Sequence, residues 1–181
     1  ANVELSKDSG SSWQTSQTLT QSGGTVGPTT ILARIPASAV ATTTQVSVTG
    51  NITSASTGAT TQNVSVTGTV NPIPVLTINP TSQTLAHNQQ TQAVLFTSNV
   101  AGTTYTWSND NTSIGIGASG SGSSIASFTA TNTGSTPQTG TFTVTPTANS
   151  VPGAQKTFTI TVNPTLPEIA VSGNGNNIAD G

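Results

Sequence analysis

Apolar and polar residues alternate over many short stretches of this 181-residue chain, where Thr, Val and Ile recur. In Phe158–Val162 the apolar residues are separated by threonines, and in Val64–Val70 Ser65 and Thr67 point away from the valines. In Ile31–Ile35 one face is apolar, with Ile31, Ala33 and Ile35, and Arg34 points the other way. Successive side chains of a strand point to opposite faces, so the pattern predicts one buried and one wet face. No stretch of useful length has helical spacing. The predicted strands are Thr29–Ile35, Gln45–Ile52, Gln62–Val70, Ala93–Ser98, Thr103–Ser108, Ser124–Ala130, Gly140–Thr145 and Lys156–Val162.

Two short sequences occur twice and indicate how these strands are organised. VSVTG occurs at Val46–Gly50 and, 18 residues later, at Val64–Gly68, which predicts a hairpin that turns near Thr57–Gly58. TVNP occurs at Thr69–Pro72 and again at Thr161–Pro164, an offset of 92 residues. This offset is close to the length of an immunoglobulin-like domain, which is about 100 residues.

We therefore predict an all-β fold made of tandem immunoglobulin-like antiparallel β-sandwiches. The predicted domains are residues 1–72 and residues 73–163. Residues 164–181 are expected to be a linker and the first strand of a further, incomplete domain, in a chain that is a piece of a longer one. Proline after each TVN ends the last strand and stiffens the linker, because it cannot donate to a ladder.

Charge is nearly absent, which argues against several classes of function. Only 4% of the residues are charged, and the formal net charge is −2. Three scattered cations, Lys7, Arg34 and Lys156, cannot neutralise a row of phosphates, so nucleic-acid binding is not expected. No basic amphipathic stretch and no apolar run of about 18 residues occurs, so membrane insertion is not expected. The chain has no Cys, which excludes disulfides and thiolate metal sites.

Longer stretches resemble modules of very large secreted and surface proteins of Bacteroidota. LSKDSGSSW (Leu5–Trp13) and STGATTQNVSVTGTV (Ser56–Val70) resemble an immunoglobulin-like domain that recurs in those proteins. YTWSNDNTSIGIGASGSG (Tyr105–Gly122) and KTFTITVNP (Lys156–Pro164) resemble their PKD-like domain, and PEIAVSGNGNNIADG (Pro167–Gly181) looks like the start of a choice-of-anchor-type domain. The resemblance implies a giant adhesin exported by type IX secretion, with an extracellular or cell-surface location.

Residues that could carry chemistry are few and scattered. His87, the single histidine, has no acid, His or Cys near it in sequence, so a solvated loop or strand edge is expected. Glu4 and Asp8 are close in sequence, but their loop-like surroundings do not favour a glycosidase pair. Asp110 is a weak candidate ligand for calcium, against the alternative of a plain Asn-Asp-Asn turn. We predict no catalytic residue and no other cofactor.

The aromatic residues allow two interpretations. Tyr105 and Trp107 lie two apart on a predicted strand and so share a face, which fits either a sugar-stacking platform or a sandwich core. Because only 4% of the residues are aromatic, burial is the favoured interpretation. Trp13 is expected to cover one end of the first sandwich. If exposed, Trp13, Tyr105 and Trp107 could contact a ligand.

The leading functional hypothesis is a non-enzymatic spacer, or stalk module, of a bacterial adhesin. Edge strands without charged residues are poorly protected against pairing, so an extracellular filament or sheath subunit is the alternative. A carbohydrate-binding module is the third possibility. The expected partners are neighbouring immunoglobulin-like domains, further copies of the chain or cell-surface glycans.

Overall fold

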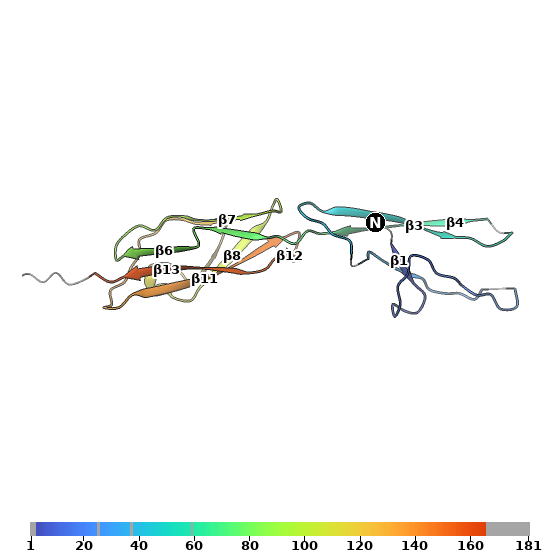
Figure 1. Ribbon diagram of the computed structural model, residues 1–181, viewed down its shortest axis with the longest axis horizontal. Coiled ribbons are helices and arrows are strands. Elements are labelled where there is room, and N and C mark those ends of the chain that lie inside the picture. The colour runs from blue at the N-terminus through green and yellow to red at the C-terminus, as the bar shows by residue number, and fades with distance from the viewer. Residues whose placement is uncertain (1–2, 25, 37, 59, 166–181) are drawn as a thin grey trace, which may run out of the picture. The chain divides into compact units, whose positions relative to one another are not determined.

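The computed structural model describes residues 3–24, 26–36, 38–58 and 60–165 and shows an all-β protein, which confirms the predicted class (Figure 1). The described residues contain no α-helix. Most strand pairs are antiparallel, and β13 pairs with β6 in parallel. The elements are β1 (Glu4–Ser6), β2 (Leu32–Arg34), β3 (Val46–Ser54), β4 (Gln62–Val70), β5 (Leu76–Asn79), β6 (Ser82–Ala86), β7 (Val94–Ser98), β8 (Thr104–Asn109), η1 (Thr112–Ile114), β9 (Ser119–Ser121), β10 (Ser124–Ile125), β11 (Gln138–Ala148), β12 (Val151–Pro152) and β13 (Lys156–Asn163).

The chain divides into two compact units. Unit 1 comprises Ala1–Leu76 with two later segments, Ser98–Thr104 and Pro146–Ala154, and the rest of the chain forms unit 2. The predicted division between residues 72 and 73 stays a prediction, since these units are not contiguous in sequence. Of the predicted third segment, residues 166–181 lie outside the described residues.

In unit 1, strands β3 and β4 form a long antiparallel hairpin that turns at Thr57–Gly58, as the VSVTG repeat predicted. Thr53 donates to Asn63 (2.8 Å) and Ser65 donates to Asn51 (2.9 Å) on its polar face. The opposite face is formed by Val46, Val48, Gly50, Ile52, Val64, Val66, Gly68 and Val70. The alternation of apolar and polar residues thus gives the hairpin one apolar face and one polar face.

Two glycines of the hairpin leave room for side chains from the β1–β2 region. A Cβ added at Gly68 would lie 2.7 Å from Ile35 Cδ1, and one added at Gly50 would lie 3.0 Å from Val3 Cγ2. Val3 and Ile35 therefore pack directly on the apolar face of the hairpin. This cover is partial, because Val64 remains 59% exposed.

Unit 2 contains most of two sheets, with strand orders β10-β7-β5 and β6-β13-β11-β8-β9. Phe96 on β7 lies 5.8 Å from Tyr105 on β8 and 6.3 Å from Phe158 on β13, so the two sheets meet through their aromatic side chains. Phe158 also stacks on Phe142 of β11 at 4.5 Å. The buried apolar residues of unit 2 are Ile78, Val94, Phe96, Tyr105, Ile114, Ile125, Ala130, Phe142, Val144, Phe158, Ile160 and Val162.

The chain changes sheet between β5 and β6, at the cis peptide bond between Asn79 and Pro80. Neither strand was predicted, because Pro80 interrupts the segment and weakens its strand signal. β6 runs parallel to β13, with Ser82 opposite Thr159 and Ala86 opposite Asn163. The chain therefore runs along β6 and later along β13 in the same direction.

Candidate functional site

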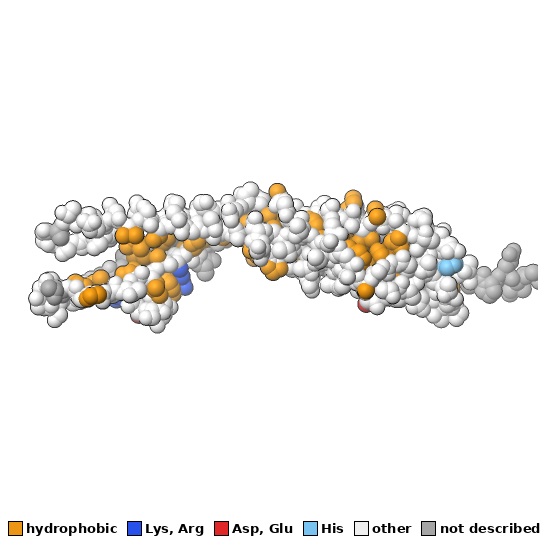
Figure 2. All heavy atoms as spheres, turned by 180° about the vertical axis from the view of Figure 1, so that it is seen from behind, with side chains coloured by type: hydrophobic (Ala, Val, Ile, Leu, Met, Phe, Trp, Pro, Cys, Tyr) orange, Lys and Arg blue, Asp and Glu red, His pale blue; other side chains and the backbone are white. Residues whose placement is uncertain are grey.

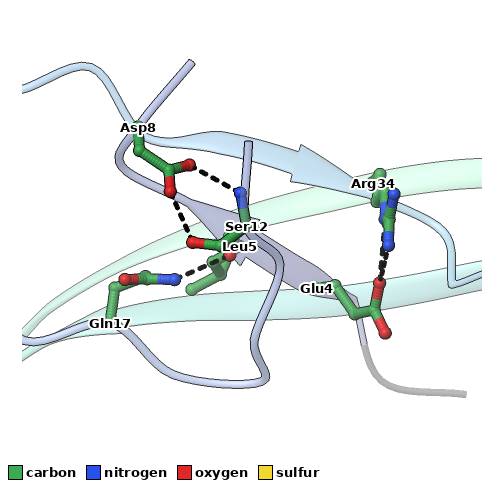
Figure 3. A network of polar contacts seen from close by, with 6 residues as sticks. All are labelled: Glu4, Leu5, Asp8, Ser12, Gln17 and Arg34. Carbon is green, nitrogen blue, oxygen red and sulfur yellow. Dashed lines mark hydrogen bonds and ion pairs between the residues drawn. The ribbon is translucent and has the colours of Figure 1, made fainter. Parts of the chain in front are cut away.

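The acidic residues near the N-terminus are bound to separate partners (Figure 3). The Asp8 carboxylate accepts hydrogen bonds from the Ser12 backbone N–H (2.9 Å), the Ser12 hydroxyl and the Ser6 hydroxyl. These bonds, those from Ser12 first, hold the pKa of Asp8 well below its usual value. Glu4 instead pairs with Arg34 at 2.8 Å. The Asp8 carboxylate thus stabilises a turn, and the Glu4 carboxylate forms a surface ion pair. The two carboxylates do not face each other as a glycosidase pair would.

Trp13 is half-buried, and one face of its ring is occupied. The Arg34 guanidinium lies 4.3 Å from the ring centroid. A Cβ added at Gly10 would lie 3.4 Å from Trp13 Cζ2, so this turn passes close to the ring edge. Trp13 is therefore held within a local cluster of unit 1.

A shallow groove of about 90 Å³ opens beside Arg34. Its volume is well below the roughly 300–1,000 Å³ of typical small-molecule sites. It offers one cation and otherwise mainly apolar walls, which gives little chemistry for orienting a substrate. Its lining residues are Val3, Ala33, Arg34, Ile35, Val66, Thr67 and Gly68.

The aromatic pair on β8 lies against the core of unit 2. Tyr105 is only 6% exposed, and burial raises the pKa of its phenol. Trp107 is half-buried and lies 5.8 Å from Phe142. Directly opposite Trp107, Gly120 on β9 makes room for the indole, because a Cβ there would lie 2.4 Å from Trp107 Cζ2. These rings form no exposed, coplanar platform.

The Asn-Asp-Asn segment uses its side chains on nearby backbone. Asp110 Oδ1 accepts from Thr141 N–H at 2.7 Å, and Asn111 Oδ1 accepts from Ser113 N–H at 3.1 Å as the N-cap of η1. Asn109 Nδ2 donates to the carbonyls of Asn111 (2.9 Å) and Gly117 (3.3 Å). Within the described ranges no three His, Cys, Asp or Glu residues come together. This geometry fits the plain turn better than a calcium ligand set.

His87 and Asn132 form a polar cluster that the sequence did not reveal. His87 Nδ1 accepts from Asn132 N–H at 2.9 Å, which requires that nitrogen to be unprotonated. The Asn132 side chain, 2% exposed, donates to the carbonyls of Val162 (2.7 Å) and Thr136 (2.9 Å) and accepts from Gly134 N–H (3.0 Å). The cluster ties a loop to the end of β13. The bonds to Gly134 and Thr136 are local, whereas Val162 and His87 lie 30 and 45 positions away, and no local pattern indicates these two contacts.

The outer face of the β11–β13 pair is a regular array of threonines. Thr139 and Thr161 lie opposite each other with their hydroxyl oxygens 2.9 Å apart. The threonines on this face are Thr139, Thr141, Thr143, Thr157, Thr159 and Thr161. Figure 2 shows that uncharged polar atoms and backbone make up most of the visible surface. Hydroxyl groups replace charge as the main polar groups of this face.

Comparison with family models, with curated proteins and with solved structures finds no match for this chain. Among the described residues, no helix has the length and apolar character needed to cross a bilayer.

Proposed function

We propose that this chain is a non-enzymatic spacer of a large extracellular bacterial surface protein, built from tandem immunoglobulin-like sandwiches. The observation that carries the proposal is the parallel pairing of β6 with β13. The chain enters this sheet of unit 2 at Ser82 and leaves it at Asn163, at opposite ends of the ladder. A domain whose chain enters at one end and leaves at the other holds the preceding and the following chain segments apart by its own length.

The strand order of unit 2 supports an immunoglobulin-like arrangement. In such domains the first, second and fifth strands share one sheet, and the third, sixth and seventh share the other. Here β5, β7 and β10 form one sheet, and β8, β11 and β13 lie in the other. Tyr105 and Trp107 on β8 occupy the strand that carries the core tryptophan in immunoglobulin domains.

The polar side chains also favour a structural role. Each acidic residue described above accepts bonds from its own turn or sheet, and His87 accepts from a backbone amide. Catalytic groups need a free, correctly placed donor or acceptor beside a cleft. Bonds directed to backbone instead hold turns and strand ends in place.

The proposed extracellular location can be tested by introducing one cysteine and labelling it. Thr157 is exposed on β13 and the chain has no Cys, so Thr157→Cys creates a unique label site. We expect a membrane-impermeant maleimide to label this variant on intact cells of the source organism, while the parent chain stays unlabelled. Labelling that appears only after lysis contradicts an extracellular function.

A filament subunit is the second candidate function, because the β3–β4 hairpin has unprotected edges. Its strands contain no charged residue and no proline, and they form a two-stranded sheet among the described residues. A second copy of β4, antiparallel about Val66, would place Val64 opposite Gly68 and keep the apolar faces together. Val64, 59% exposed, would gain cover by this pairing.

The test is the oligomeric state over a concentration series by sedimentation velocity. If the hairpin edges assemble copies, the wild-type chain associates and Thr67→Lys, which puts a charge in the middle of β4, stays monomeric. Thr57→Lys in the hairpin turn is the matched control and should associate like the wild type. A wild-type chain that stays monomeric throughout eliminates this candidate.

A further inference from the structure

We infer that His87 is a pH sensor: its neutral ring holds the loop of residues 132–137 against the end of β13, and protonation of the ring releases this loop. Such a sensor goes beyond the proposed spacer function and requires only the fold of unit 2. His87 directly follows β6, and its backbone N–H donates to the carbonyl of Asn163, the last residue of β13 (2.9 Å). The backbone therefore fixes the place of the ring beside the loop.

Asn132 connects the His87 ring to the rest of the loop. Its backbone N–H donates to His87 Nδ1 (2.9 Å). Its side chain donates to the carbonyl of Thr136 (2.9 Å) and accepts from Gly134 N–H (3.0 Å), both within the loop. The same side chain donates to the carbonyl of Val162 (2.7 Å). Asn132 thus ties the loop both to the ring and to β13.

Protonation of the ring removes the acceptor on which this arrangement depends. A protonated imidazole carries an N–H donor on each ring nitrogen, so Nδ1–H would face the N–H of Asn132. Asn132 is only 2% exposed, so water cannot replace the lost acceptor while the loop stays closed. The His87 ring is half-buried and can turn out into solvent. We therefore expect the loop to open when the ring takes up a proton.

Among the described residues of unit 2, no charged group is placed to compensate a protonated His87 ring. The charged residues of this unit are Asp110, Lys156, Glu168 and Asp180, and the last two lie outside the described residues. Asp110 accepts from a backbone amide of β11, and Lys156 begins β13, seven residues before Asn163. The loop and the last residues of β13 contribute only neutral groups to the surroundings of the ring.

The sign of the pH effect follows from these contacts. The neutral ring stabilises the closed loop, so the loop is closed at higher pH and opens as the pH falls. Histidine is the side chain that ordinarily changes charge between about pH 8 and pH 5, and the chain has one His and no Cys. The opening is therefore expected in this range and is assigned to one side chain.

Hydrogen exchange of single backbone amides in the full chain, followed by NMR, tests the sensor. The readout is the protection factor, which corrects for the pH dependence of exchange itself. Between pH 7.5 and pH 5, we expect the protection of Asn132 and Gly134 to fall by roughly tenfold, the effect of losing a hydrogen bond to a buried group. The amide of Phe142, in the core of the unit, should keep its protection.

His87→Asn is the matched control, because its amide oxygen lies two bonds from Cβ, as Nδ1 does, and accepts a hydrogen bond at either pH. In this variant the protection of Asn132 should be the same at both pH values. The ring of the wild-type chain gives a second readout: ¹⁵N NMR at pH 7.5 should show that Nδ1 is the unprotonated nitrogen.

Four results would overturn the sensor. The first is equal protection of Asn132 at both pH values in the wild-type chain. The second is an equal loss in His87→Asn, which would assign the effect to another group. The third is a parallel loss at Phe142, which would show unfolding of the whole unit rather than opening of the loop. The fourth is a proton on Nδ1 at pH 7.5, which decides the matter even if His87→Asn does not fold.

Discussion

Units 1 and 2 both contain strands of alternating apolar and polar residues, yet they bury their apolar residues to different extents. Unit 2 places Phe142, Ile160 and Val162 at 0% exposure between facing sheets. In the hairpin of unit 1, only Val48 is buried, and Val64 is 59% exposed. Alternation therefore specifies a two-faced strand, but a core needs a second sheet with side chains large enough to meet it. The aromatic residues of unit 2 supply that contact.

The largest expected effect is the loss of an aromatic side chain from unit 2. Phe142→Ala removes the ring that stacks on Phe158 at 4.5 Å and contacts Trp107 at 5.8 Å. Leaving a cavity there should cost about 3–5 kcal/mol. Val64→Ala, on the exposed hairpin face, should change stability by no more than about 0.5 kcal/mol. Urea unfolding measures both, and similar losses would contradict the contrast between the units.

A second expected effect concerns close packing between β11 and η1. Gly140→Ala places a Cβ 2.5 Å from Ile114 Cδ1 and 2.8 Å from Asn109 Oδ1, so the core must shift, at a cost of about 1–3 kcal/mol. Gly117→Ala is the matched control, because nothing lies within 4 Å of its added Cβ. Thermal unfolding should separate the two variants. Equal melting temperatures would show that the η1 packing is loose.

A third expected effect tests buried polar groups. Asn132→Ala leaves the carbonyls of Val162 and Thr136 without their donor and should cost about 1–3 kcal/mol. Asn51→Ala removes an exposed partner of Ser65 on the hairpin and should cost much less. Hydrogen exchange of the backbone amides near residue 162 gives a local readout. Unchanged protection of these amides from exchange would contradict a structural role for Asn132.

The smallest expected effect is a pH dependence confined to unit 1. The pKa of Asp8 is lowered in the folded state from a usual value of 3.8, so its ionised form stabilises the turn. That stabilisation is present above the usual pKa and is lost as the pH falls below it. Asp8→Ala should reduce protection of the Ser6–Ser12 amides at pH 7 and have less effect at pH 3. An equal effect at both pH values would contradict this assignment.

The sequence predicted those parts of the fold that depend on local pattern. The hairpin and its turn at Thr57–Gly58 follow from alternation and a repeat, and the composition favoured burial of Tyr105. β5 and β6 were missed, because Pro80 masks them and the parallel pairing with β13 is a long-range contact.

The roles of individual polar residues were less predictable. Glu4 and Asp8 are close in sequence, yet they bind Arg34 and Ser12 separately. His87 was expected in a loop or at a strand edge, and its bond to Asn132 depends on a residue 45 positions away. The Asp8–Ser12 bond is local, but the Glu4–Arg34 and His87–Asn132 contacts join distant parts of the chain, and no local pattern encodes those two.

The most direct test is the distance across unit 2 between spin labels at Thr77→Cys and Asn163→Cys, both exposed positions in a chain that has no Cys. Asn163 pairs with Ala86, so Thr77 lies nine residues before the level of Asn163, and the change from β5 to the facing sheet falls within those residues. Nine fully extended residues would span about 30 Å at about 3.3 Å per residue, and the change of sheet shortens this span, so we expect one narrow distribution at about 20–25 Å. A distribution below about 15 Å would mean that the chain enters and leaves side by side, and would contradict the spacer.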